Sequence, residues 1–313
     1  MRYRKYLAGG VEASELGFGA WQIGVNSGWA DVPEREAVAM IEAALDHGVN
    51  FFDTAPNYGH GTSEARLGKV FEHIDRSTII INTKFGHSDA GVVDYDPNRI
   101  RPSVDKSLAR LKVDYLDSVI IHSPPLALLD GNQNDHYEVF ESLQAEGKIR
   151  AYGASVDFAA EVKLLLDTTN AQVVECFFNV LHQDVAGAFG LAQSKNAAII
   201  AKIPFDSGWL TGKYDQHSTF TGVRSRWTAE DKRIRAELVE TVSDMVGGTD
   251  ALVATALNFC TAFDAVSTVI PGATSMAQLL DNLAAMERPM AEDLRQALEA
   301  FYETNVRQLQ LPW

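Results

Sequence analysis

Cysteine is scarce in this chain of 313 residues, which contains only Cys176 and Cys260. Both lie in apolar stretches, VVECFF and ALNFCTAF, and neither belongs to a CxxC pair. Two isolated cysteines exclude a disulfide framework, and their spacing matches no zinc or redox motif. We therefore expect two buried thiols in a reducing compartment.

Long apolar runs are also missing. No stretch approaches the roughly 18 uninterrupted apolar residues of a membrane-spanning helix. The basic N-terminus MRYRKYLAGG is not followed by the apolar segment of about 7–15 residues that a secretory signal peptide needs. These absences predict a cytoplasmic protein.

Basic residues are outnumbered, because 27 Lys and Arg stand against 42 Asp and Glu and give a net charge of −15. A field of this sign repels phosphate backbones and anionic lipid headgroups. Nucleic acid and membrane surfaces are therefore not expected as partners, which leaves a small molecule as the predicted ligand.

Several catalytic motifs are absent as well. The chain has no HExxH, no Walker A loop and no GxSxG nucleophile elbow, and its GFGAWQ and GASVD stretches do not complete a dinucleotide fingerprint. His60, His87 and His122 do not have the spacing of metal ligands, so we expect no metal.

What the chain does contain is a regular alternation of short β-branched runs with amphipathic helical segments. Eight such alternations, without a linker between them, predict an α/β fold: a single (β/α)8 TIM barrel over residues 1–313. A long loop over residues 206–229 would follow strand seven, and an extra C-terminal helix would begin near Glu292. The expected strands are Leu16–Gly19, Val49–Phe52, Thr78–Ile81, Leu116–Ile121, Ile149–Gly153, Ala171–Val174, Ala197–Ala201 and Ala265–Ile270.

Local signals mark some of the helix ends. Gly48 and Gly147 follow helical segments, where a glycine can adopt the left-handed conformation that ends a helix. Ser63 precedes a helical run and is expected as its N-cap.

Polar or ionisable residues follow the buried strands of the predicted barrel. The active site of such a barrel lies at the carboxyl ends of the strands, so these side chains are expected to converge there. Tyr58 lies five residues beyond the first of them, in the loop DTAPNYGHG. The residues at the ends of strands two to seven are Asp53, Lys84, His122, Ser155, Glu175 and Lys202.

The chemistry of this set indicates proton exchange with an oxygen atom. A tyrosine hydroxyl has an ordinary pKa near 10, and a neighbouring lysine favours its phenolate. Asp53 would hold the ammonium of Lys84, and His122 would donate a hydrogen bond to the reacting oxygen. Since the set contains no nucleophile, it suits hydride transfer to or from a bound nicotinamide.

Several motifs in the chain resemble the aldo-keto reductase superfamily. They are GVNFFDTAPNYGHGTSEARLGKVF, INTKFG, VIIHSPP, GASV, PFDSGWLTGKY and VIPGATSMAQLLDN, and they extend over essentially the full chain. The match is closest to the bacterial long-loop branch. The resemblance implies a barrel that binds NAD(P)H, with a catalytic tetrad of Asp53, Tyr58, Lys84 and His122.

The resemblance also implies positions for the ligands. Trp21, Trp29, Tyr58 and His122 would contact the substrate, and Arg224 is a further candidate for a phosphate contact. The implied cofactor positions are Ala20, Trp21, Asp53, Ser155, Glu175, Lys202, Pro204, Phe205, Ser207, Lys213, Gly272, Thr274, Gln278, Asp281 and Asn282.

Three positions near the implied nicotinamide site depart from the family pattern. Val156 replaces the usual Asn, Glu175 the usual Gln, and Lys202 the aromatic residue that stacks on the nicotinamide. An ammonium beside a cationic nicotinamide needs neutralisation. We therefore predict an ion pair between Glu175 and Lys202, with an unpaired, solvated side chain as the alternative.

The predicted function is an NAD(P)-dependent oxidoreductase that interconverts a carbonyl compound (an aldehyde, ketone or aldose) and its alcohol. NADP(H) is the first choice of cofactor, because it is frequent in the family that the chain resembles. NAD(H) is the alternative, because PGATSMAQ lacks the basic residues that usually bind the 2′-phosphate. Two other functions stay open: an NAD-dependent sugar or alcohol dehydrogenase that runs oxidatively, and a non-catalytic nicotinamide-binding sensor. The substrate and the oligomeric state are open too.

Overall fold

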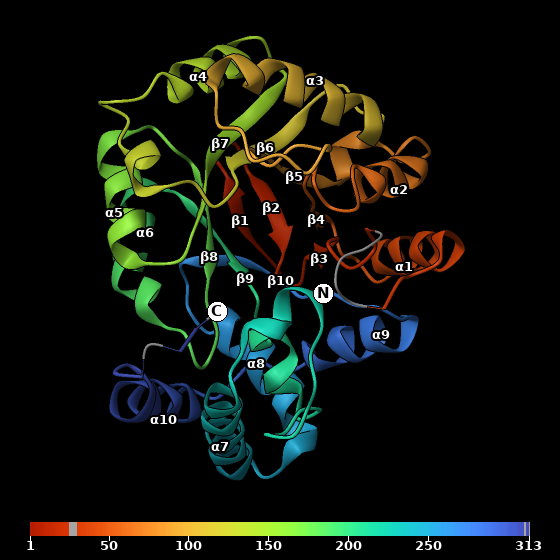
Figure 1. The fold of residues 1–313 in the computed structure, drawn as a ribbon. Coiled ribbons are helices and arrows are strands. Elements are labelled where there is room, and N and C mark those ends of the chain that lie inside the picture. The colour runs from red at the N-terminus through yellow and green to blue at the C-terminus, as the bar shows by residue number, and fades with distance from the viewer. Residues whose placement is uncertain (25–29, 310, 313) are drawn as a thin grey trace.

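Eight parallel strands form the centre of the molecule, as the sequence predicts (Figure 1). The computed structural model describes residues 1–24, 30–309 and 311–312. Sequential strands are hydrogen-bonded neighbours from β3 to β10, and the bridges Leu16–Val269 and Gly19–Gly272 bring the first and last strands together. The strands are β3 (Phe18–Gly19), β4 (Phe51–Asp53), β5 (Ile80–Phe85), β6 (Leu116–Ile121), β7 (Ile149–Val156), β8 (Val173–Phe177), β9 (Ala198–Lys202) and β10 (Val266–Ile270).

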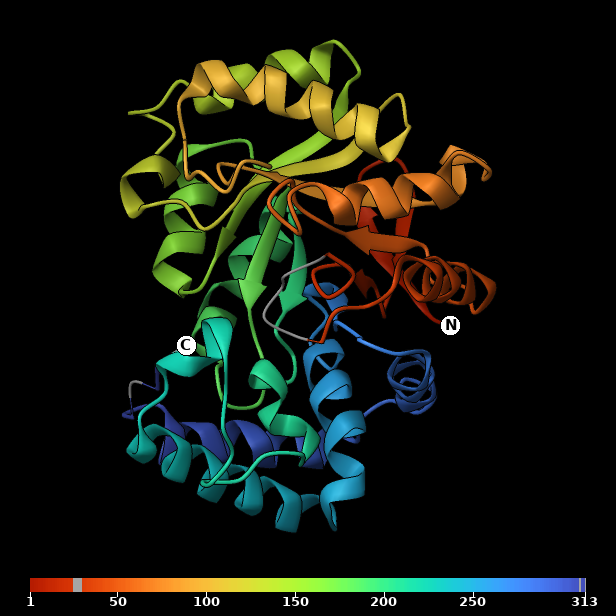
Figure 2. The same ribbon diagram turned by 45° about the vertical axis from the view of Figure 1, so that its right-hand side comes forward.

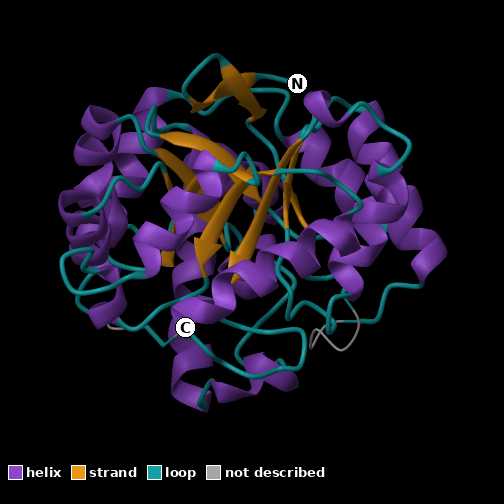
Figure 3. Cartoon of the chain, turned by 90° about the horizontal axis from the view of Figure 1, so that it is seen from above, coloured by secondary structure: helices purple, strands orange, loops and turns teal. Residues whose placement is uncertain are grey.

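Helices surround this sheet on its outer face, which Figure 3 shows from above. The arrangement is the (β/α)8 TIM barrel that the alternating pattern predicts. The helices that lie between the strands or follow the last one are α1 (Glu34–Asp46), α2 (Thr62–Phe71), α3 (Ile100–Leu111), α4 (His136–Ala145), α5 (Ala159–Thr168), α6 (Phe189–Lys195), α8 (Leu252–Thr261) and α9 (Met276–Ala285). The expected C-terminal helix is α10 (Glu292–Phe301).

The segment between β9 and β10 is the longest connection of the barrel. It contains two short helical turns, Asp206–Thr211 and Gly222–Arg226, and then α7 (Ala229–Val246) ahead of α8. Figure 2 shows α7 and α10 on the side of the molecule opposite α3 and α4. The long loop after strand seven is therefore confirmed, and part of it is helical.

An N-terminal β-hairpin, which the sequence analysis did not predict, precedes the barrel. Its strands are β1 (Tyr3–Leu7) and β2 (Val11–Ser14), joined by two glycines with positive φ. Tyr6 packs edge-on against Phe51, with ring centroids 5.1 Å apart. The hairpin thus covers the end of the barrel where the strands begin.

The inside of the barrel changes character along the strands. Because side chains alternate between the two faces of a strand, every second residue points inward. Inward residues, most of them from the lower part, join the hairpin in one apolar cluster, whereas the upper ends of β4, β5, β8 and β9 bring charged side chains inward. The cluster consists of Tyr6, Leu7, Ala13, Phe51, Ile80, Ile120, Ala151, Val173, Ala198, Ile200 and Ile270.

Helix ends agree with the sequence at two positions and disagree at one. Gly48 and Gly147 follow the C-caps of α1 and α4 with φ of 85° and 75°, which confirms both predictions. The prediction for Ser63 was wrong, because Gly61 adopts φ 86° and starts α2 at Thr62. The Ser63 hydroxyl turns inward and donates to the carbonyl of Ala20 at 2.8 Å.

Two further absences hold for the described residues. No helix among them combines the length and the apolar character that crossing a membrane requires. Cys176 and Cys260 are buried free thiols, as expected, and burial raises the pKa of both.

Candidate functional site

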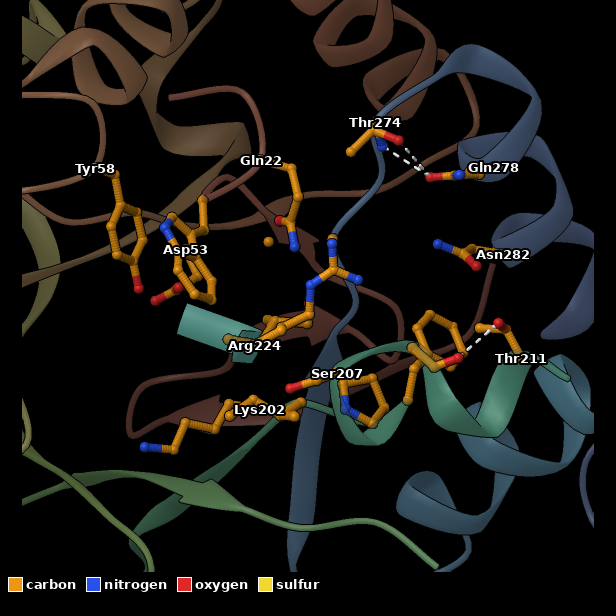
Figure 4. Close-up of a pocket in the computed structure, with 18 of the residues that line it drawn as sticks. Gln22, Asp53, Tyr58, Lys202, Ser207, Thr211, Arg224, Thr274, Gln278 and Asn282 are labelled. Atoms are coloured by element: carbon orange, nitrogen blue, oxygen red, sulfur yellow. Dashed lines mark hydrogen bonds between the residues drawn. The ribbon is translucent and has the colours of Figure 1, made fainter. Parts of the chain in front are cut away.

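A cavity of about 590 Å³ opens at the carboxyl ends of the strands (Figure 4). Most of the residues singled out from the sequence line it, although they come from all parts of the chain. They are Trp21, Asp53, Tyr58, His122, Glu175, Lys202, Pro204, Phe205, Ser207, Lys213, Arg224, Gly272, Thr274, Gln278, Asp281 and Asn282. Ala20, Lys84 and Ser155 are not among the residues that line it. Trp29 lies outside the described residues.

Lys84 is buried beneath the cavity and is held by Asp53. Its Nζ lies 2.6 and 2.7 Å from the two carboxylate oxygens of Asp53 and 3.1 Å from the carbonyl oxygen of Thr54. A second carboxylate, that of Glu175, lies 3.2 Å away. Burial alone would lower the pKa of Lys84, but the two carboxylates outweigh it and raise this pKa above its ordinary value. Lys84 is therefore a permanent cation.

Tyr58 lies beside this ammonium. Its ring centroid is 5.2 Å from Lys84 Nζ, Trp21 stacks on one side at 6.1 Å, and His122 meets it edge-on at 5.9 Å. The charge of Lys84 lowers the pKa of the hydroxyl, as the sequence analysis assumed. Burial is the larger influence, and together with Asp53 and Glu175 it raises the pKa of Tyr58 above 10. The hydroxyl therefore keeps its proton at neutral pH.

His122 follows β6 and is partly buried. Burial, followed by the charges of Lys84, His87 and Lys202, lowers the pKa of His122 well below its ordinary value. Its ring is stacked on His87, with centroids 4.4 Å apart, and its Nδ1 has no hydrogen-bond partner within the described parts of the chain. His122 is thus a neutral imidazole. His87, which was considered from the sequence only as a metal ligand, holds the His122 ring by stacking against it.

The ion pair predicted between Glu175 and Lys202 is replaced by other contacts. Lys202 Nζ lies 2.9 Å from Asp157 Oδ1 and donates to Ser155 Oγ at 3.0 Å, and Ser155 donates to Glu175 Oε1 at 2.9 Å. Strand register explains the difference, because Glu175 pairs with Ile200 whereas Lys202 pairs with Phe177. Lys202 therefore stands one level above Glu175 and meets a carboxylate near its own level.

The far end of the cavity is built around the start of α9. The backbone N–H of Thr274 donates to Gln278 Oε1 at 2.9 Å, and Ser275 caps the helix by accepting from the N–H of Gln278. Gly272 leaves room for Gln22, since a Cβ there would lie 1.9 Å from the Gln22 side chain. Helix N-termini of this kind attract anionic groups.

Arg224 comes from the long loop and extends into the middle of the cavity (Figure 4). Its Nη1 donates to the hydroxyl of Tyr214 at 2.8 Å. Tyr214 and Gln22 line the cavity, yet the sequence analysis did not select them. Each directly follows a predicted ligand contact in the sequence, Tyr214 after Lys213 and Gln22 after Trp21, and this adjacency could have identified both as cavity residues.

The loop that follows β9 carries backbone strain. Ile203, Asp206 and Ser207 have φ of 58°, 45° and 57°, which is rare for residues other than glycine and an outlier for a β-branched one. The Asn179 amide donates to the carbonyl of Ile203 at 2.9 Å, and Asp206 forms a buried ion pair with Arg235 at 2.9 Å. These contacts fix the loop against the cavity.

No group of three or more potential ligands in the described residues could hold a metal ion. The cavity instead combines a buried polar end at Tyr58, cations in the middle at Lys213 and Arg224, and a helix N-terminus at the far end.

Several known proteins are similar to this chain in sequence or in fold. L-galactose dehydrogenase of Arabidopsis thaliana is 28% identical over 284 residues, which are 88% of this chain and 85% of the relative. Aldo-keto reductase YhdN of Bacillus subtilis is 32% identical over 239 residues, with 71% of this chain and 67% of the relative covered. Among solved structures, the holo form of aldo-keto reductase AKR11C1 from Bacillus halodurans has a TM-score of 0.81 at 26% identity, and all of both chains is covered.

The sequence profile of the Aldo/keto reductase family matches residues 15–303. That range contains all eight strands of the barrel and the residues at their carboxyl ends. The chain therefore belongs to the aldo/keto reductase family.

Proposed function

We propose that this protein interconverts a carbonyl compound and its alcohol, with Tyr58 as the group that exchanges the proton. As a member of its family, the chain is an NAD(P)H-dependent oxidoreductase. One observation carries the proposal: a partly buried tyrosine at the cavity lies beside a buried lysine that a carboxylate holds in place.

The nicotinamide cofactor would supply the hydride for reduction, or accept it in the reverse direction. Lys213 and Arg224 would bind its phosphates, and Thr274, Gln278 and Asn282 its adenosine end. The residues fit this group, because the cavity offers cations and a helix N-terminus in an otherwise acidic protein.

The chain's own residues would manage the proton. In reduction Tyr58 gives its proton to the carbonyl oxygen, and the charge of Lys84 stabilises the phenolate that remains. Asp53 holds Lys84 in place. Neutral His122 donates a hydrogen bond to the same oxygen and stabilises the negative charge that develops there.

The substrate would be a small aldehyde, ketone, aldose or the corresponding alcohol. The polar wall of Asn57, Ser123 and His122 at the mouth supports this choice. L-galactose dehydrogenase and D-threo-aldose 1-dehydrogenase among the relatives, each 28% identical, support it as well. Arg224 in the cavity favours NADP(H) over NAD(H), because its guanidinium can pair with a 2′-phosphate.

The test is absorbance at 340 nm with NADPH and NADH against a panel of aldehydes and aldoses, and with the oxidised cofactors against alcohols and sugars. We expect turnover with at least one pair and a higher kcat/KM with the NADP form. Tight cofactor binding without turnover on the whole panel would contradict the proposal and favour a nicotinamide sensor.

A further inference from the structure

Five charged side chains follow one another across the strand ends at the floor of the cavity. Starting at β4, they are Asp53, Lys84, Glu175, Lys202 and Asp157, and we call them the charge ladder. Their successive contacts measure 2.6 Å from Asp53 to Lys84, 3.2 Å from Lys84 to Glu175, and 2.9 Å from Lys202 to Asp157. The hydroxyl of Ser155 bridges Glu175 and Lys202.

The signs of the ladder do not cancel. Asp53 neutralises Lys84 through two short contacts, and Asp157 neutralises Lys202. Glu175 then remains as a third carboxylate against two ammonium groups. The neighbouring His122 adds no charge, because burial keeps its pKa low. When the carboxyls of Asp53 and Glu175, which we call the inner carboxyls, are both ionised, the floor of the cavity carries one excess negative charge.

That charge is buried and incompletely satisfied. Glu175 is 2% exposed, yet it lines the cavity. Its Oε1 accepts the Ser155 hydrogen bond, whereas its Oε2 accepts none from the described residues and has only the 3.2 Å ion-pair contact to Lys84. Against the opposing effect of burial, Lys84 and Lys202 lower the pKa of Glu175, so it stays ionised, and its charge helps to raise the pKa of Asp53 to about 7. A buried excess negative charge of this kind favours a ligand that brings positive charge.

We propose that Glu175 makes the site select the oxidised form of the nicotinamide cofactor over the reduced form. The inference rests on the proposed function, which brings the nicotinamide to this end of the cavity. Oxidised and reduced cofactors differ by one positive charge on the ring and share all their phosphates and the adenosine. The ratio of their dissociation constants therefore isolates the effect of the ladder from every other contact.

The expected effect is large enough to measure. At an effective dielectric constant of ~20, two unit charges roughly 12 Å apart still change a binding constant about tenfold. Preference for the oxidised form lowers the reduction potential of the bound cofactor, since it stabilises the oxidised partner of the couple. A lower potential makes the bound reduced cofactor a stronger hydride donor, so within the complex it favours reduction of a carbonyl compound.

The experiment measures dissociation constants of NAD⁺, NADH, NADP⁺ and NADPH by titration calorimetry for the wild type and four variants. At pH 8.5 both inner carboxyls are ionised, because burial and Glu175 raise the pKa of Asp53 to only about 7. Glu175→Gln removes the excess charge, Lys202→Met increases it, and the double variant returns the ladder to its original sum. Glu15→Gln is the matched control, since Glu15 is a buried carboxylate, paired with Arg2 and Arg4.

We expect tighter binding of the oxidised form by the wild type. Glu175→Gln should reduce this preference about tenfold, Lys202→Met should increase it about tenfold, and the double variant should restore it. This restoration distinguishes a charge effect from damage to the fold, because two substitutions that damaged the fold would not return the ratio of dissociation constants to its wild-type value. The inference is wrong if Glu175→Gln weakens both forms equally, or if the double variant keeps the altered ratio. If the wild type binds none of the four nucleotides, the proposed function fails with it.

Discussion

The lower and upper halves of the barrel interior are built by the same strands, yet they differ in almost every physical respect. On β4 an inward Phe51 is followed two residues later by Asp53, and on β8 an inward Val173 is followed by Glu175. The lower residues are apolar and pack against the hairpin. The upper ones are charged and line the cavity or support it. Stability and chemistry are thus separated by about 7 Å along one strand.

A hydrogen-bonded chain connects the two halves. The hydroxyls of Tyr6 and Ser118 lie 2.6 Å apart, Ser118 donates to Asn82 Oδ1 at 2.6 Å, and Asn82 donates to Asp53 at 2.8 Å. Because Ser118 uses its single proton on Asn82, Tyr6 must donate to Ser118. Two tyrosines, the buried Tyr6 below and the partly buried Tyr58 above, therefore stand at opposite ends of the polar interior.

The largest effect is expected from the upper tyrosine. Tyr58→Phe removes the proton donor and leaves the ring contacts with Trp21 and His122 in place. We expect kcat to fall by about 10²–10⁴-fold with little change in cofactor affinity. Steady-state kinetics and cofactor titration measure the two quantities. A variant with near-normal turnover would contradict the assignment of chemistry to the upper half.

The lower half should respond through stability instead. Phe51→Ala opens a cavity next to Tyr6, where the side chain is fully buried. We expect a loss of about 3–5 kcal/mol in the free energy of unfolding. Denaturant titration gives this value, and kcat at a temperature where the variant is folded should stay within a few-fold of the wild type. A larger fall in kcat would show that the halves are coupled.

A smaller effect should appear in the pH dependence of stability. Burial, and then the charge of Glu175, raises the pKa of Asp53 to about 7 against the opposing influence of Lys84. Between about pH 4 and pH 7 the folded protein therefore holds a proton that the unfolded chain has released, so this group makes stability fall as pH rises. Glu175→Gln removes one cause of the raised pKa and should reduce that fall.

The corresponding measurement compares Glu175→Gln with the wild type by denaturant titration at pH 5 and pH 8. We expect the stability of the variant relative to the wild type to rise by about 1–3 kcal/mol from pH 5 to pH 8, because Glu175 raises the pKa of Asp53. A variant that is less stable than the wild type at pH 8 would show that Glu175 is needed as a counter-ion for Lys84.

The smallest effect is expected from the lower tyrosine. Tyr6→Phe removes the terminal hydroxyl of the interior chain while Ser118 keeps its contact with Asn82. We expect a loss of about 1 kcal/mol in stability and no measurable change in kcat. As the matched partner of Tyr58→Phe, this variant makes the same chemical change at the other end. A fall in kcat comparable to that of Tyr58→Phe would mean that the hydrogen bonds from Tyr6 through Ser118 and Asn82 affect the catalytic role of Asp53.

Much of the fold follows from the sequence because burial imposes a pattern. Each expected strand overlaps an observed one, and the polar residues after them converge because all strands are parallel. The hairpin escaped prediction because YRKYL and VEAS are short and mostly polar, and their apolar residues gain a partner only in the assembled barrel.

The candidate site was predicted as a set, and its internal pairing was not. Glu175 and Lys202 end adjacent strands, which suggested an ion pair, but the register of β8 and β9 places them at different depths. A linear sequence does not contain that register. The same limit applies to Tyr58. The sequence predicts that Lys84 lies nearby, but it does not predict how strongly burial raises the pKa of the Tyr58 hydroxyl.

The hairpin below the barrel also restricts when a proton can reach Tyr58 during turnover. Tyr6 and Leu7 fill the lower end, so in the described parts of the chain the mouth is the route that joins Tyr58 to bulk water. A ligand that occupies the mouth closes this route. Each catalytic cycle of reduction would then use one proton loaded beforehand, and the next proton would enter only after product has left.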